Sequence, residues 1–379
     1  MRPQTPAELA EVMGQSGAAG RSVNLGGHFS KRTAGGPVAD AGVTISTAAM
    51  NRVRQYEPRD LTISVEAGIS YCELSRVLAE HHQMIPLDPP FSDSATIGGI
   101  LAANTSGPRR RLYGTARDLV IGLHFATLEG KLVESGGMVV KNVAGLDMGK
   151  LMIGSYGTLA AIAVVNFKVI PKPSFERTFV SQFGTAGEAL AARDAILKSP
   201  LQPAAIEVLN TAATELDKPG FILAILAGGN AASISRYERE LAALGAKPVP
   251  AGEDAAFWRA LCDFTPHYLE AHPDGASVRV SCTLKELNTV LDAAPGPVIA
   301  RAGSGVCYVY FEQPEEAAAF AAANAREGRP AVVEYAPENR KQDLDLWPAP
   351  GQDLEIMRRI KHMFDPRQLL NRGRLYGHI

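Results

Sequence analysis

The sequence predicts an α+β protein with two domains, and three observations support this class. Short runs rich in β-branched residues alternate with segments whose apolar residues recur at helical spacing. Loops made largely of glycine and other small residues separate several of these runs. The two prolines in residues 171–173 stiffen the chain and mark the best domain boundary. A chain of 379 residues is long enough to build two hydrophobic cores.

The first domain is expected to begin with a helix, because Thr5 can cap it and Glu8 stands three residues later. A second helix is expected at 69–82, and residues 119–127 and 131–134 flank a turn and should form a hairpin. The remaining strands are expected where apolar and β-branched runs end in turns, at 22–25, 42–46, 61–68 and 161–170.

The same alternation continues beyond residue 173. The segments expected to form helices or strands are 177–183, 186–198, 204–210, 221–229, 233–244, 256–261, 277–282, 284–293, 306–311 and 317–325. This pattern favours helices on one face of an antiparallel sheet. The sequence shows no internal repeat.

Composition excludes several classes of function. The formal net charge of −2 argues against a nucleic-acid partner, and the one strong basic cluster, residues 109–111, also fits a solvated loop. No apolar run is long enough to cross a bilayer, and residues 1–9 lack the apolar core of a signal peptide. We therefore expect a cytoplasmic protein without direct membrane insertion, which reaches the inner membrane, if at all, as a peripheral protein held by partners.

The cysteines indicate neither a metal site nor an iron–sulfur cluster. Cys72, Cys262, Cys282 and Cys307 are scattered, without the close spacing that such ligand sets require. They are expected to be reduced thiols. The prediction for metals is none.

Glycine-rich loops carry the functional signal. They occur at residues 88–108, 136–147 and 154–158, with arginines following the first of them. Small residues with exposed N–H groups suit a diphosphate or a flat ring. Any one of these loops alone is also explained as a tight turn against a helix.

The order of the loops is more specific than any single loop. Residues 24–31, 95–107, 113–118 and 141–159 together resemble the FAD-binding domain of the vanillyl-alcohol oxidase and p-cresol methylhydroxylase (PCMH) superfamily. Within it, 141–147 is most similar to the accessory FAD-binding subunit of bacterial glycolate oxidase. Residues 364–374 resemble the closing motif of the same enzymes.

The resemblance implies an α+β fold with a two-lobed PCMH-type FAD-binding domain at 1–172. It also implies a ferredoxin-like, substrate-side cap domain at 173–330. Residues 331–379 are then expected to return to the FAD-binding domain. The cofactor implied is FAD.

The family pattern assigns cofactor contacts to the loops. Those expected on the diphosphate and isoalloxazine side are Gly26, Gly27, His28, Ser30, Pro89, Thr96, Ile97, Gly98, Gly99, Ser106, Gly107, Tyr113, Gly114 and Asp118. Those expected near the adenine and ribose are Gly154, Gly157, Thr158 and Ile162, and Asn371 is a candidate for the flavin face, as is Arg374.

His28 raises the question of covalent attachment. Some relatives attach FAD through a histidine that follows a Gly-Gly pair in this loop, as His28 does. The ending Ser30-Lys31 matches the glycolate oxidase subunits instead and favours non-covalent FAD, with His28 near the diphosphate or exposed.

Two departures from the family pattern lie near the central motif, where Leu146 replaces a tyrosine and Ala160 replaces a glycine. Lys141 and Asn142 are expected to contact a phosphate or a partner, or Lys141 only extends from the edge of a core. Asp147 is expected to cap the next helix.

The catalytic residues are not predicted. Oxidation of a 2-hydroxy acid needs a cation for the carboxylate and a base for the hydroxyl. His362 reads as a packed histidine, and Glu334, Tyr335 and Arg340 are only possible residues of a substrate side. The catalytic histidine and arginine set of the sister flavoprotein in such complexes has no match in this chain.

The implied function is that of the FAD-binding subunit of a glycolate oxidase complex. Its partners would be a small 2-hydroxy acid, glycolate or D-lactate, a sister flavoprotein and an iron–sulfur subunit. Two alternatives stay open, namely a stand-alone FAD-dependent hydroxy-acid or alditol oxidoreductase and a non-catalytic FAD-binding assembly subunit.

Overall fold

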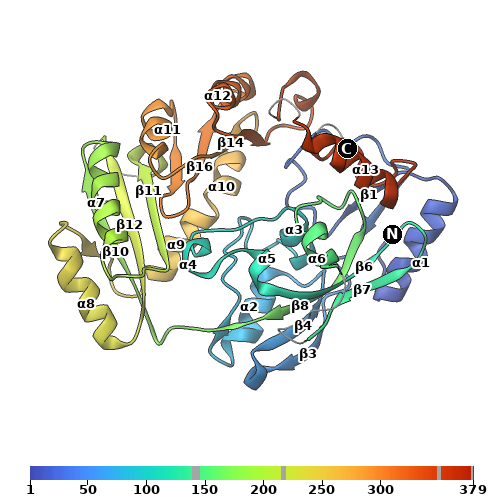
Figure 1. Cartoon of the computed structure of the whole chain (residues 1–379), viewed down its shortest axis with the longest axis horizontal. Helices are drawn as coiled ribbons and strands as arrows, with labels where there is room; N and C mark the ends of the chain where they lie inside the picture. The colour runs from blue at the N-terminus through green and yellow to red at the C-terminus, as the bar shows by residue number, and fades with distance from the viewer. Residues whose placement is uncertain (139–145, 215–218, 348–350, 377–378) are drawn as a thin grey trace. The chain divides into compact units, whose positions relative to one another are not determined.

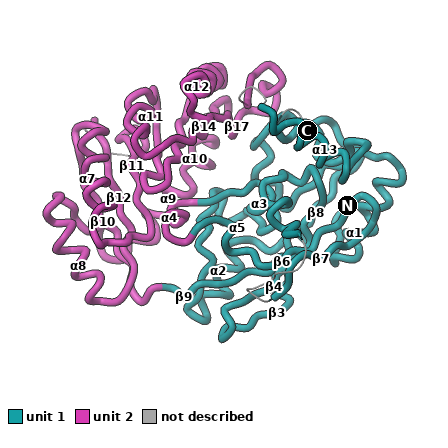
Figure 2. Tube along the Cα trace, viewed as in Figure 1, with its two compact units in different colours: residues 1–106, 114–172, 349–379 teal, residues 107–113, 173–348 magenta. Residues whose placement is uncertain are grey.

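The computed structural model describes residues 1–138, 146–214, 219–347, 351–376 and 379. The chain divides into two compact units, shown in Figure 2. Unit 1 comprises Met1–Ser106, Gly114–Lys172 and Ala349–Ile379, and unit 2 comprises Gly107–Tyr113 and Pro173–Pro348.

The division after Lys172 falls within the proline-containing segment 171–173. The chain returns to unit 1 at Ala349 and not at residue 331, because β17 (Ala331–Tyr335) pairs with β14 (Ala276–Ser281) in the sheet of unit 2. The short segment Gly107–Tyr113 also groups with unit 2, which no sequence pattern indicated.

Unit 1 is built around a five-stranded antiparallel sheet with strand order β3-β4-β8-β6-β7 (Figure 1). Its strands are β3 (Val53–Glu57), β4 (Thr62–Glu66), β6 (Val120–Ala126), β7 (Leu132–Gly136) and β8 (Ala161–Lys168). Unit 1 also contains the parallel pair β1 (Val23–Gly26) and β2 (Val43–Ser46), and a small separate pair joins β5 (Gln83–Met84) to β9 (Ile170–Pro171).

The first helix begins as expected, since the Thr5 hydroxyl accepts a hydrogen bond from the backbone N–H of Glu8. The helices of unit 1 are α1 (Pro6–Ala18), α2 (Tyr71–Ala79), α3 (Ile97–Ala102), α5 (Ala116–Leu119), α6 (Met148–Met152) and α13 (Asp353–Phe364), with the 3₁₀ turn η1 (Pro58–Asp60). One core lies on one face of the five-stranded sheet, and another packs α1 against the opposite face and the β1–β2 pair.

Unit 2 contains one eight-stranded antiparallel sheet with strand order β13-β10-β12-β11-β15-β16-β14-β17. The strands not yet bounded are β10 (Phe175–Phe183), β11 (Ala205–Asn210), β12 (Phe221–Gly229), β13 (Lys247–Pro248), β15 (Val298–Arg301) and β16 (Val306–Phe311). The helical segments are α4 (Arg110–Tyr113), α7 (Ala186–Lys198), α8 (Ala231–Ala242), α9 (Asp254–Cys262), α10 (Phe264–Ala271), α11 (Leu287–Ala293) and α12 (Pro314–Arg326), with η2 (Thr211–Ala213) and η3 (Lys341–Asp343).

The topology of unit 2 is a repeated one. The first half runs β10-α7-β11-β12-α8-β13, and the second half runs β14-α11-β15-β16-α12-β17. Each half is a βαββαβ module whose strands lie in the ferredoxin-like order, and the two modules join where β11 pairs with β15. The duplication lies in the topology, and the sequence itself shows no internal repeat.

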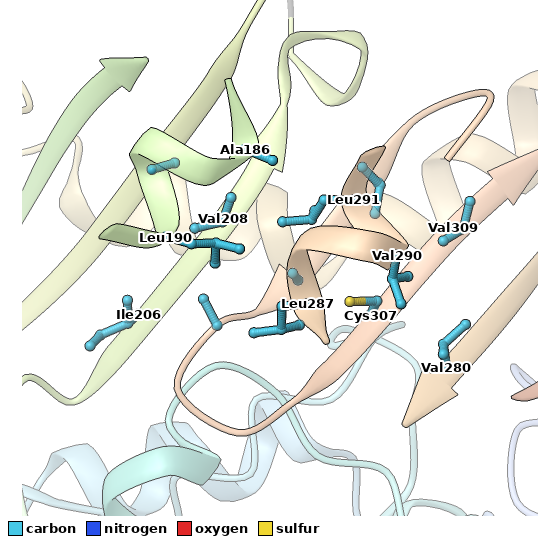
Figure 3. Close-up of a cluster of buried hydrophobic side chains, with 14 of the residues drawn as sticks. Ala186, Leu190, Ile206, Val208, Val280, Leu287, Val290, Leu291, Cys307 and Val309 are labelled. Atoms are coloured by element: carbon cyan, nitrogen blue, oxygen red, sulfur yellow. The ribbon is translucent and has the colours of Figure 1, made fainter. Parts of the chain in front are cut away.

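The helices of unit 2 cover both faces of the sheet. Figure 3 shows part of the core on one face, where Leu190 of α7 and Leu291 of α11 gather with Val208 and Cys307 of the sheet. The helices α8 and α12 belong to the same core. Trp258 of α9 and Tyr268 of α10 pack on the opposite face. The prediction of helices on a single face is wrong, because α9 and α10 supply aromatic residues to that second face.

The junction between the two modules is held by buried polar contacts. The Nη1 of Arg301 lies 2.8 Å from Oε2 of Glu207, and both side chains are almost fully buried. The Asn210 side chain donates to Gly296 O and accepts from the N–H of Val298. Removal of one partner of such a pair would leave the other charge buried and uncompensated, which is strongly destabilising.

Candidate functional site

A cavity in unit 1 brings together parts of the chain that are far apart in the sequence. It lies between the turn after β1, the helix α3, the turn before β8 and the C-terminal segment. Its lining residues are Leu25, Gly26, Gly27, His28, Phe29, Ser30, Lys31, Arg32, Thr47, Thr96, Gly98, Gly99, Ala102, Ala103, Tyr156, Gly157, Ala160, Ile162, Asn371 and Arg374.

The turn after β1 needs glycine because its neighbours approach closely. A Cβ atom on Gly26 would lie 2.6 Å from the ring of Phe29, and one on Gly27 would lie 2.1 Å from Oγ1 of Thr96. The Ser46 hydroxyl donates to Gly27 O and holds the turn against β2. The turn therefore presents bare backbone to the cavity.

The segment around Gly98 and Gly99 is the start of a helix and not the loop of small residues that the sequence suggested. Thr96 caps α3, and its hydroxyl accepts from the N–H of Gly99 at 3.3 Å. The N–H of Gly98 donates to Ala67 O at 2.7 Å. Both N–H groups, which were expected to donate to a phosphate, are thus engaged within the protein, and the two glycines contribute space to the cavity instead.

Asn371 joins two sides of the cavity. Its Oδ1 accepts from the N–H of Leu25 at 2.7 Å, and its Nδ2 donates to Tyr156 O at 2.8 Å. Asn371 and Tyr156 both have positive φ, 39° and 53°, as does the cavity residue Phe29 at 57°. Such strained conformations persist where surrounding contacts fix them, and they are concentrated at functional sites.

His28 is exposed, and its ring has a fixed contact. The Nδ1 atom lies 3.0 Å from Ser94 O. A carbonyl oxygen only accepts, so a hydrogen bond at this contact requires the hydrogen on Nδ1.

Cationic side chains line the same cavity. Lys31 and Arg32 follow the β1 turn, and Arg374 belongs to the C-terminal segment. The Nη2 of Arg374 donates to Lys31 O and to Arg32 O, so it fixes the backbone that carries the other two cations. A cavity with bare glycine backbone and three cations fits a ligand with a diphosphate group.

Several predicted residues have other surroundings. Ile97 and Thr158 are fully buried, Ile97 in a hydrophobic core and Thr158 with its hydroxyl donating to Ser155 O. Asp118 accepts from the N–H of Thr115 at 2.8 Å and so caps α5. Tyr113 packs with the aromatic core of unit 2. The other predicted residues outside the cavity lining are Pro89, Ser106, Gly107, Gly114 and Gly154.

The structure also adds lining residues that sequence reasoning missed. Phe29 and Tyr156 stand inside the quoted motifs, so their position next to the glycines was the available signal. Thr47 carries no motif, and only the folded chain brings it to the cavity, whereas Ala102 and Ala103 stand inside the motif at 95–107. Ala160, which departs from the family pattern, is among the lining residues.

The remaining candidates are resolved differently. Asp147 caps α6 through the N–H of Lys150, as predicted, whereas Leu146 is 84% exposed. Lys141 and Asn142 lie outside the described residues.

The possible substrate-side residues have partners within the protein. Glu334 pairs with Arg279 at 3.5 Å, and Arg340 pairs with Glu315. Tyr335 is buried, and His362 is exposed on α13 and not packed as expected.

Two family models match the two ends of the chain. Residues 1–136 match the FAD binding domain, and residues 348–375 match the C-terminal domain of FAD linked oxidases. Both segments contribute to the cavity, the first through Gly26 to Ala103 and the second through Asn371 and Arg374. The cofactor of this chain is FAD.

Curated relatives are similar over part of their length. The glycolate oxidase subunit GlcE of Escherichia coli is 38% identical over 39% of this chain and 42% of its own. The glycolate oxidase subunit GlcD of Bacillus subtilis is 30% identical over 45% of this chain and 36% of its own, and the mitochondrial D-lactate dehydrogenase [cytochrome] of Arabidopsis thaliana is 34% identical over 45% and 30%. The chain thus spans less than half the length of these relatives.

Solved structures share the fold over nearly the whole chain. An alkyldihydroxyacetonephosphate synthase superposes with a TM-score of 0.70 at 20% identity, covering 98% of this chain and 76% of that one. The 4-ethylphenol oxidase of Gulosibacter chungangensis gives 0.73 at 14% identity, covering 99% and 88%.

These findings confirm the α+β fold of PCMH-type flavoproteins. The chain thus carries an FAD binding domain over residues 1–136, and it shares its fold over nearly its whole length with the 4-ethylphenol oxidase. Across the described part of the chain, no helix is both long and apolar enough to cross a membrane.

Proposed function

We propose that this chain is an FAD-dependent oxidoreductase subunit that takes part in the oxidation of small 2-hydroxy acids. The observation that carries this proposal is the cavity of unit 1, where segments from both FAD-linked family matches meet. Relatives named as glycolate oxidase subunits and as a D-lactate dehydrogenase support the substrate class.

The lining residues have distinct roles in this proposal. Gly26, Gly27 and Gly99 leave space for the cofactor, and Lys31 and Arg374 offer positive charge to its diphosphate. When bound, FAD supplies the two-electron acceptor for the reaction. The attachment in this proposal is non-covalent, because the loop ends in Ser30-Lys31.

We infer that the chain works in a complex. Among the described lining residues, the titratable side chains are His28, Lys31, Arg32, Tyr156 and Arg374, and none is a carboxylate. The four cysteines are free thiols at separate places in the sequence, so they offer no cluster for onward electron transfer. A sister flavoprotein and an iron–sulfur subunit would supply these functions, at the inner membrane if the partners bind there.

Dye reduction tests the proposal. The FAD-loaded chain is incubated with glycolate or D-lactate and an electron-accepting dye, first alone and then with its sister subunits. We expect turnover only in the reconstituted complex, and no turnover when the chain is omitted from it. Rapid reduction by the isolated chain would favour a stand-alone dehydrogenase, and full activity of the complex without the chain would contradict a role in oxidation.

A further inference from the structure

We propose that Lys361 is a positioning residue for the cofactor cavity, acting through Asp365 and the C-terminal segment on Asn371. This inference rests on the proposed FAD site. Lys361 is not among the residues that line the cavity, so its effect on the cofactor must be indirect.

The ammonium of Lys361 is buried with three hydrogen-bond acceptors. It donates to Asp365 Oδ2 at 2.7 Å, to Thr158 O at 2.7 Å and to Leu370 O at 3.1 Å. The side chains of Lys361 and Asp365 are only 4% and 0% exposed. Three acceptors satisfy all three hydrogens of the ammonium, as a buried charge requires.

Asp365 transmits this anchoring to the segment that follows α13. Its Oδ1 accepts from the N–H of Leu369 at 2.9 Å, and its Oδ2 accepts from the N–H of Leu370 at 2.8 Å. Leu370 in turn bridges to Val23 in parallel fashion, beside β1. The carboxylate thereby sets the path of the backbone immediately before Asn371.

Asn371 delivers the effect to the cavity. Its backbone N–H donates to Val23 O at 2.9 Å, and its side chain bonds both the N–H and the C=O of Leu25 and the C=O of Tyr156. Lys361 holds the same turn before β8 through Thr158 O. The buried ammonium of Lys361 therefore fixes two parts of the cavity wall. One is the backbone next to Asn371, and the other is the turn before β8, to which the Asn371 side chain is bonded.

The chemistry of the pair explains why a charge stands here. Burial lowers the pKa of Lys361, and the adjacent Asp365 opposes this shift. An apolar residue would fill the volume at a lower desolvation cost. It would not bind Thr158 O and Leu370 O. The ammonium is therefore required to position Asn371 and the turn before β8, and not to fill the hydrophobic core.

The test is a double-mutant cycle on FAD affinity in the full chain. The variants are Lys361→Met, Asn371→Ala and the double variant, with Arg367→Ala as the matched control. Arg367 belongs to the same segment and bonds Gly17 O, but it is exposed. FAD dissociation constants are measured by flavin fluorescence, together with visible circular dichroism of the bound flavin and thermal unfolding of the apoprotein.

We expect Lys361→Met and Asn371→Ala each to weaken FAD binding about tenfold or more, with the same change in the flavin spectrum, and the double variant to be no weaker than the poorer single variant within about threefold. Arg367→Ala should bind FAD as the wild type does. Wild-type affinity in Lys361→Met, or losses that multiply in the double variant, would overturn the proposal.

If Lys361→Met does not fold, Asp365→Asn takes its place in the cycle with the same expected outcomes. Failure of the wild-type chain to bind FAD would instead contradict the proposed function, so the two failures are distinguishable.

Discussion

The two units use polar contacts in different ways. In unit 1, single contacts join distant parts of the chain, as between Leu25 and Asn371, and Phe29 and Tyr156 adopt strained backbone conformations beside them. In unit 2, regular strand pairing in two modules of one topology supports a buried ion pair at the module junction. The cavity thus depends on a few unrepeated contacts, whereas the sheet depends on repeated ones, so substitutions should affect cofactor binding and unit stability separately.

Gly99→Val is expected to show the largest difference between the effect on FAD affinity and the effect on stability. A Cβ atom on Gly99 meets only Oγ1 of Thr96, at 3.2 Å, so the fold should tolerate the side chain, which then occupies the cavity. We expect FAD affinity to fall on the order of a hundredfold while thermal unfolding of the apoprotein is little changed. Flavin fluorescence titration measures the first quantity and circular dichroism the second.

The control for this variant is Gly137→Ala, because a Cβ atom on Gly137 would have no neighbour within 4 Å among the residues that the structure describes. It should retain wild-type affinity. Full FAD content in Gly99→Val would show that α3 does not face the cofactor.

Arg301→Met is expected to have the opposite effect, which is a loss of stability in unit 2 without a loss of FAD binding. Removing one partner leaves the Glu207 carboxylate buried without its cation, and we expect the free energy of unfolding of unit 2 to fall by about 3 kcal/mol or more. The FAD content at low temperature should not change. Chemical denaturation followed by tryptophan fluorescence reports on this unit, since Trp258 lies in its core.

The matched variant is the double substitution Arg301→Met and Glu207→Leu, which removes both charges and should recover most of the lost stability. If the double variant were as unstable as the single one, the pair would stabilise unit 2 by more than the neutralisation of its two charges.

A smaller effect is expected from Asp118→Asn. Hydrogen bonds from Thr115 lower the pKa of Asp118 against the opposing effect of partial burial, so the ionised carboxylate stabilises the folded state. Replacing this cap should cost about 1 kcal/mol near neutral pH. The contribution is fully present above the ordinary carboxyl pKa of 3.8 and is lost as the pH falls through the lowered folded value.

Thermal unfolding of both proteins at neutral and acidic pH measures this difference, which should narrow at acidic pH. The FAD affinity should stay the same, because Asp118 caps a helix and does not line the cavity. A marked loss of FAD affinity in Asp118→Asn would show that Asp118 contacts the cofactor, as the sequence predicted.

The smallest effect is expected from His28→Ala. The ring is exposed and bonded to Ser94 O, and we infer no covalent link, so FAD should remain bound with at most a few-fold loss of affinity. Acid precipitation should release FAD from the variant and from the wild type alike. Flavin that stays with the wild-type pellet but not with the variant would identify His28 as a covalent attachment point.

The two units also differ in what the sequence can predict. The periodic segments of unit 2 were predicted well, and α7, β12 and β16 begin and end at the expected residues. Its duplication was not predicted, because the modules share topology without visible sequence similarity. The second face of its sheet was missed because α9 and α10 add aromatic side chains without any motif.

For the cavity, motif order was informative, since the predicted Gly26, Thr96, Gly157 and Asn371 all line it. Local roles were less predictable. Gly98 was expected to present its N–H, yet that group bonds Ala67 O because α3 starts there. Thr47 could be found only from the tertiary fold. The same holds for the Lys361 network, which depends on a side chain that meets Thr158 O across 203 positions of sequence.

The central claim is that the cavity of unit 1 binds FAD without a covalent bond. The most direct measurement is the visible absorption spectrum of the purified full chain before and after acid precipitation, with FAD quantified in the supernatant and the pellet. A yellow protein that releases close to one FAD per chain into the supernatant is the predicted result. A colourless protein that takes up no added FAD would contradict the claim.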